Sequence, residues 1–146
     1  MAQSTTLRFG KFDVMLGVEN EGAITYTAPC GFLSKALNLS KSLSEVLIPD
    51  CDDPDAPIAV GRDVESISWS VSGEGVLAEE SVETWLDAFG GVTSVPVKVV
   101  QKFPGKTITF TGNAHLESLE TAVERGGRAT ANVSIQGDGP ITWAIV

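Results

Sequence analysis

Apolar and small polar residues alternate with a period of two through most of the chain. In residues 64–72, Ile67, Trp69 and Val71 alternate with four serines. This pattern is typical of a strand with one buried face and one small polar face. Similar or weaker patterns predict further strands at Thr6–Val14, Ala23–Ala28, Val95–Gln101, Thr107–Thr111, Ala129–Ile135 and Pro140–Val146.

One segment has the spacing of a helix instead. Residues 79–89 (EESVETWLDAF) place Val82, Trp85, Leu86 and Phe89 at i, i+3, i+4 and i+7, which is one face of an amphipathic helix. Three glutamates lie in its first turns, where the helix dipole favours negative charge, and two glycines follow it. One helix among seven or eight short strands predicts a mainly β fold, a β-sandwich with one flanking α-helix.

Glycines and prolines mark the expected breaks between these elements. Gly73–Gly75 precedes the helix, Gly126-Gly127 divides two strands, and Gly137–Pro140 (GDGP) is predicted to turn the chain between the last two strands. Pro96 lacks an amide hydrogen and therefore suggests that the strand at residues 95–101 lies at a sheet edge.

Residues 30–55 do not fit the alternating pattern throughout. Alternation holds to Ser42, an apolar stretch without clear periodicity follows, and an acidic, proline-rich run (PDCDDPDAP) occupies residues 49–57. Such a long excursion is either a loop that covers the core or an extended surface for a partner.

Length and charge narrow the class of protein. The 146 residues fit one domain, residues 1–146, and no apolar run is long enough to cross a bilayer. We see no secretory signal, so we expect synthesis and retention in the cytoplasm. The net charge of −9 argues against a nucleic-acid-binding protein. It is consistent with solubility alone, and it does not exclude DNA passing nearby without binding.

The chain has few residues of the types that catalysis or metal binding requires. His115 is the only histidine, it continues a predicted strand, and no GxSxG motif accompanies it, so we expect no enzyme activity and no cofactor. The aspartates of residues 50–55 could supply oxygens to calcium, but the glycine and glutamate of an EF-hand loop are missing. Cys30 and Cys51 have no CxxC neighbour, which argues against zinc, and the sequence leaves open whether they form a disulfide.

The order of these features resembles a known family. It begins with an early strand and a glycine turn, followed by Tyr26–Gly31 (YTAPCG), an alternating serine-rich stretch to Ile48 and the acidic segment Ile48–Pro57. Ser66–Gly73 (SISWSVSG), the helix around Trp85 and a C-terminal series of strands ending in Gly139–Trp143 come after these. In this order, over nearly its whole length, the chain is similar to the tail tube (major tail) proteins of long-tailed phages and gene transfer agents.

The resemblance implies a structural role in a virion tail. Subunits of this family form hexameric rings, in which one sheet of each subunit joins its neighbours in a barrel, and an extended loop reaches the next ring. The rings stack into a hollow tube around a tape-measure protein, contact other tail proteins, and later conduct DNA without binding it specifically. Residues 30–55 would then be the inter-subunit loop, and its contact would be made by Leu43, Val46, Leu47, Ile48, Asp50, Asp52 and Asp53. The protein would be made in the cytoplasm of a host bacterium.

Two other kinds of protein share the predicted fold class. The first is a calcium-dependent or carbohydrate-binding β-sandwich module that would use the acidic loop of residues 50–55. The second is another virion component, such as a tail-terminator or capsid-decoration protein.

Overall fold

The computed structural model describes residues 3–146, apart from the side chain of Asn20. This part of the chain is mainly β with a single α-helix, as the alternating pattern predicts. Its elements are a 3-10 turn η1 (Phe9–Lys11), β1 (Phe12–Asn20), β2 (Ala23–Thr27), β3 (Phe32–Ile48), β4 (Ala59–Val76), α1 (Glu79–Gly90), β5 (Val95–Lys102), β6 (Thr107–Ala122) and β7 (Thr130–Ile145).

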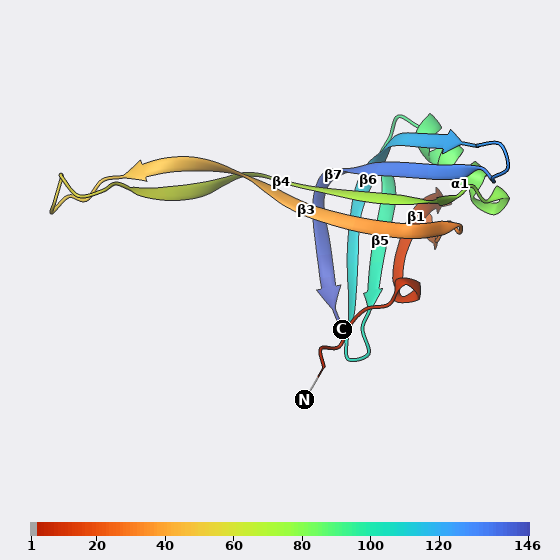
Figure 1. Cartoon of the computed structure of the whole chain (residues 1–146), viewed down its shortest axis with the longest axis horizontal. Coiled ribbons are helices and arrows are strands. Elements are labelled where there is room, and N and C mark those ends of the chain that lie inside the picture. The colour runs from red at the N-terminus through yellow and green to blue at the C-terminus, as the bar shows by residue number, and fades with distance from the viewer. Residues whose placement is uncertain (1–2) are drawn as a thin grey trace.

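All seven strands belong to one antiparallel sheet in the order β2-β1-β5-β6-β7-β4-β3. The long strands β6 and β7 run through two layers of this sheet, down the page and across it in Figure 1. We call β1, β5, residues 107–111 and residues 142–145 the lower layer; the upper layer contains β3, β4 and the other halves of β6 and β7. The two layers of the predicted sandwich are therefore parts of one bent sheet.

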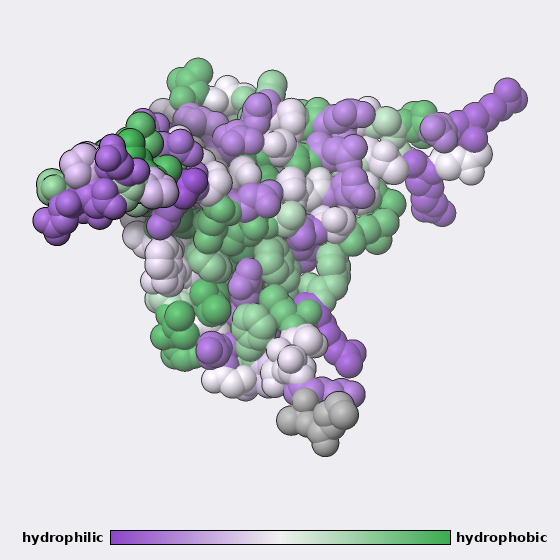
Figure 2. Space-filling view, turned by 60° about the vertical axis from the view of Figure 1, so that its left-hand side comes forward, coloured by the Kyte–Doolittle hydropathy of each residue, from purple (hydrophilic) through white to green (hydrophobic). Residues whose placement is uncertain are grey.

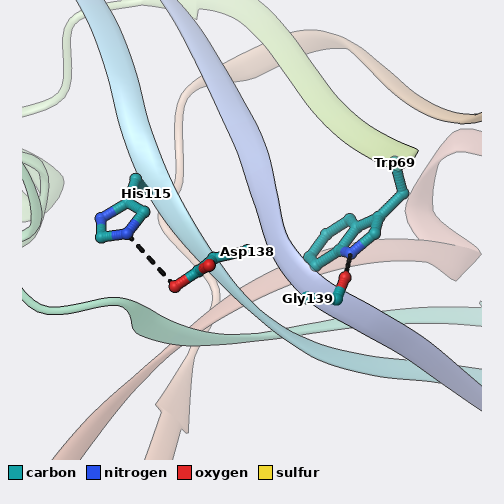
Figure 3. Close-up of polar contacts among 4 residues, drawn as sticks. All are labelled: Trp69, His115, Asp138 and Gly139. Carbon is teal, nitrogen blue, oxygen red and sulfur yellow. Dashed lines mark hydrogen bonds and ion pairs between the residues drawn. The ribbon is translucent and has the colours of Figure 1, made fainter. Parts of the chain in front are cut away.

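The bend occurs where the ring of Trp69 lies against two glycines. A Cβ atom on Gly112 or Gly137 would collide with this ring, so both positions need glycine. The indole nitrogen of Trp69 donates a hydrogen bond to the Gly139 carbonyl at 3.2 Å (Figure 3). The prediction of a turn at residues 137–140 is wrong, because the chain bends here around Trp69 and continues as one strand.

The alternating residues supply most of the core. Trp69 and Val71 of β4 are buried, whereas Ile67 of the same strand is 61% exposed because β4 has left the body of the protein at that point. The core cluster contains Val14, Leu16, Trp69, Val71, Trp85, Val97, Val99, Ala114, Leu116, Val133 and Ile135.

The predicted helix is present as α1, one residue longer than expected. Its buried anchor is Trp85, whose ring meets that of Phe32 edge-on with 5.6 Å between centroids. Leu86 and Phe89 share its apolar face but are more than half exposed.

The prediction that residues 95–101 form an edge strand is wrong, because β5 lies between β1 and β6. Pro96 is tolerated because the pairing with β1 extends only to Val97, so Pro96 has a strand neighbour on the β6 side alone.

Ser81 connects α1 to the residues just before β3 by a hydrogen bond. It is 3% exposed, and its hydroxyl lies 3.1 Å from the carbonyl oxygen of Cys30 and 3.3 Å from that of Ala78. Ser81→Ala removes the donor and leaves the Cys30 carbonyl without it. We expect a loss of about 1 kcal/mol in the free energy of unfolding, measured by urea denaturation. A stability equal to that of the parent protein would contradict this role.

Candidate functional site

The most prominent feature is a two-stranded arm that leaves the body of the protein (Figure 1). β3 and β4 pair along their full lengths, but β7 pairs with β4 only between Ser70 and Val76. Residues 39–68 therefore project as a hairpin, which we call the arm. At about 3.3 Å per residue, the part of β3 within the arm spans roughly 30 Å.

The arm has one apolar face and one face rich in serine. Residues opposite each other in an antiparallel pair point to the same side, so the pairs Leu39–Trp69, Leu43–Val64 and Leu47–Val60 share a face. That face continues the core face of β4 outward, with side chains between 46% and 64% exposed. Its apolar members are Leu39, Leu43, Leu47, Val60, Val64 and Ile67; the opposite face carries Ser40, Ser42, Ser44, Ser66 and Ser68. Figure 2, in which the arm comes forward at the left, shows hydrophobic and hydrophilic residues side by side on it.

Side-chain contacts agree with this division. On the serine face the hydroxyls of Ser40 and Ser68 lie 2.7 Å apart. On the apolar face Glu45 and Arg62 form an exposed ion pair at 3.5 Å. Exposed pairs of this kind contribute little stability, so the arm holds its shape mainly through its backbone ladder.

At the tip, the aspartates form a turn. One carboxylate oxygen of Asp50 accepts hydrogen bonds from the backbone amides of Asp52 at 2.9 Å and Asp53 at 3.3 Å. Within residues 3–146, no three metal-ligating side chains come together. Cys30 and Cys51 are both exposed and free in this structure, so they form no disulfide with each other here.

The predicted interface residues are thus all exposed on the arm, but they do not form one cluster. The extended segment is present as β-structure, since residues 32–48 form β3. Leu43 and Leu47 lie on the apolar face, whereas Val46 and Ile48 point to the opposite face, where Ile48 covers Gly61. The contact they make with another subunit remains a prediction.

Sequence reasoning missed the β4 half of the apolar face, namely Val60, Val64 and Ile67. Ile67 stands in a clean alternation with Trp69 and Val71, which suggested a core position. The available signal was the matching length of the two strands on either side of the acidic run, which is the arrangement of a hairpin.

His115 lies in a predicted strand, now β6, and faces Asp138 of β7 at 3.3 Å (Figure 3). Both side chains are about half exposed, and the pair lies on the surface of the sheet.

In the part of the chain that the structure describes, no helix is long and apolar enough to cross a membrane.

Comparison with known proteins decides the family. A family model described as phage tail tube protein matches residues 10–143. The chain belongs to this family. It is therefore a structural subunit of a tail tube, as the order of its sequence features suggested.

Solved structures of the same fold include tails and tubes of several particles. The tail of an empty gene transfer agent particle, determined with C6 symmetry, has a TM-score of 0.73 at 13% identity, covering 95% of this chain and 99% of that one. The SPP1 tail tube has a TM-score of 0.67 at 12% identity, covering 94% and 78%. The sheath–tube complex of an extracellular contractile injection system gives 0.60 at 12%, covering 97% and 93%. No curated protein matches this tail-tube family member in sequence.

Proposed function

We propose that this tail-tube subunit assembles into six-membered rings, and that the arm connects each ring to the next in a hollow tube. The observation that carries the proposal is the amphipathic arm. Two-stranded hairpins are marginally stable in water by themselves, and this one presents six apolar side chains that the described part of the chain leaves exposed. Burial of Leu47 alone contributes about 1–2 kcal/mol, repeated for every subunit of a ring.

The lower layer has the form needed to close a ring. Within the described chain, residues 12–15 of β1 and 142–145 of β7 each have a strand neighbour on one side only. The two edges run in opposite directions, so β7 of one subunit can pair antiparallel with β1 of the next. The C6 symmetry of the gene transfer agent tail supports six subunits. About 24 strands tilted by ~40° give a barrel roughly 48 Å across between backbones.

The two faces of this layer differ in character. Val14, Val99 and Phe110 stand in one row and face the core. The opposite face is made mainly of polar or small side chains, and we assign it to the lumen. Its polar or small members are Asp13, Lys98, Thr109, Thr111, Thr142 and Ala144, and Met15 and the buried Val100 lie among them.

DNA would pass along this wall without adhering to it. On this face Asp13 and Lys98 offset each other, so it offers no excess of cations to bind phosphates. The net charge of −9 belongs to the chain as a whole, and its repulsion extends over about one Debye length, ~8 Å at physiological salt. Before ejection the same space would hold the tape-measure protein. On this proposal the subunit performs no catalysis, is made in the host cytoplasm and ends in the virion tail, in contact with other tail proteins.

Electron microscopy of the purified protein at high concentration tests the proposed function. We expect long hollow tubes of indefinite length. Closed rings that never stack would indicate a tail-terminator or decoration protein instead. A protein that stays monomeric at every concentration would contradict the proposal.

The alternative function, calcium binding, predicts a cation site at the arm tip. Because Asp50 is engaged with the backbone of its own turn, we expect titration with calcium chloride in a calorimeter to show no saturable binding. Asp52→Asn and Asp53→Asn should then leave the titration unchanged. A saturable heat that these two substitutions abolish would favour the calcium-dependent module.

A further inference from the structure

The helix α1 and strand β6 leave an apolar groove between them, of about 410 Å³. Trp85 lies in it, and the half-exposed side chains of Leu86 and Phe89 stand along its helix side. An adjoining hollow shares Leu86 and is lined by Glu79 and Glu83. The groove is thus an apolar strip with carboxylates beside it.

The apolar face of the arm has complementary chemistry. Lys41 stands on that face opposite Ile67, between the levels of Leu39 and Leu43. The other cation there, Arg62, is partly neutralised by Glu45. The apolar face of the arm, with its lysine, therefore complements the apolar groove with its neighbouring carboxylates. Charge complementarity of this kind contributes more to the choice of partner than to affinity.

The arm and the groove lie at opposite ends of the molecule. α1 contacts the start of β3, where Trp85 meets Phe32, whereas the arm is the far part of the same strand, from residue 39 onward. Figure 1 shows the arm projecting away from α1. The arm cannot reach the groove of its own chain, so a contact between them joins two copies head to tail. When the contact is not exchanged reciprocally between two copies, it propagates from copy to copy.

We infer that the groove formed by Leu77, Val82, Leu86, Phe89 and Leu119 receives the apolar face of the arm from a second copy of this chain, with Lys41 facing Glu83. The inference rests on the proposed function, since it names the receptor for the arm in the adjacent ring. It also accounts for the two exposed apolar surfaces, the apolar face of the arm and the groove beside α1.

Paired substitutions test the arm and the groove separately. Leu43→Asp alters the arm, and Leu86→Asp alters the groove. Each should raise the critical concentration for tube assembly about tenfold or more, because a carboxylate would replace an apolar side chain in a contact that excludes water. Ser40→Asp on the serine face and Val92→Asp, at a side chain that is 94% exposed, should assemble like the parent protein. Circular dichroism should show all four variants folded.

Mixing the two defective proteins separates the possible results. Leu86→Asp protein keeps an intact arm and Leu43→Asp protein keeps an intact groove, so the mixture should form paired assemblies that neither protein forms alone, detected by native mass spectrometry. If Leu43→Asp blocks assembly and Leu86→Asp does not, the arm stacks rings but the groove is not its receptor. If Leu43→Asp assembles normally, the stacking role of the arm is wrong as well, and the inference falls with it.

Charge reversal gives an independent check that preserves the apolar surfaces. Lys41→Glu and Glu83→Lys should each weaken assembly, more so at low salt, and the double variant should restore it. A double variant no better than either single change would overturn the pairing of Lys41 with Glu83.

Discussion

Leu47→Asp is expected to abolish long tubes while leaving the subunit folded. Leu47 is 64% exposed on the arm, so the isolated subunit loses almost no packing and its free energy of unfolding should stay within about 0.5 kcal/mol of the parent value. In the ring interface, the new carboxylate would be removed from water while Arg62 on the same face is already paired with Glu45, which costs several kcal/mol at every subunit. Electron microscopy and sedimentation velocity measure assembly, and urea denaturation measures stability.

Leu33→Asp is the matched control for this experiment. Leu33 belongs to the same strand and is also exposed, but it lies beside the body and outside the arm. We expect Leu33→Asp protein to form tubes. Tubes of normal length from Leu47→Asp protein would show that the arm does not connect the rings.

Trp69→Ala is expected to cause the largest loss of stability, about 3–5 kcal/mol. The side chain is 3% exposed and fills the inside of the bend, where Gly112 and Gly137 leave room for its ring. Alanine would leave a cavity there and would also remove the hydrogen bond to the Gly139 carbonyl. The bend between the layers should loosen, so assembly should fail together with folding.

Trp143→Ala is the control that separates a buried tryptophan from an exposed one. Trp143 is 61% exposed on the lower layer, so its truncation should change the free energy of unfolding of the monomer by about 0.5 kcal/mol or less. Urea denaturation of both variants measures the difference. A loss below about 1 kcal/mol for Trp69→Ala would contradict the central position assigned to this ring.

Local patterns in the sequence were sufficient to predict the helix and the type of most strands, but not the lengths of the strands. The spacing of Val82, Trp85 and Phe89 predicted α1, and the alternation of Ala131, Val133 and Ile135 predicted the buried face of β7. Both patterns are short-range consequences of helix and strand geometry. The bend at Gly137 was not predictable in this way, because it depends on Trp69, which is far away in sequence.

The same limit applies to the arm. The exposed Leu43 and Leu47 could be singled out from the sequence, because a run of apolar residues beside an acidic loop is unusual. The sequence could not predict that Ile67 is exposed whereas Trp69 is buried. Both belong to one continuous alternation, and they differ only because the pairing of β4 with β7 ends between them. The division of Val46 and Leu47 between two faces likewise depends on the register with β4.

Cryo-electron microscopy of tubes assembled from the unmodified protein tests the central claim most directly. We predict a sixfold symmetric tube in which the lower layer lines the lumen and the arm of each subunit lies against a subunit of the next ring. An arm that stays within its own ring, or projects into solvent without a partner, would contradict the account.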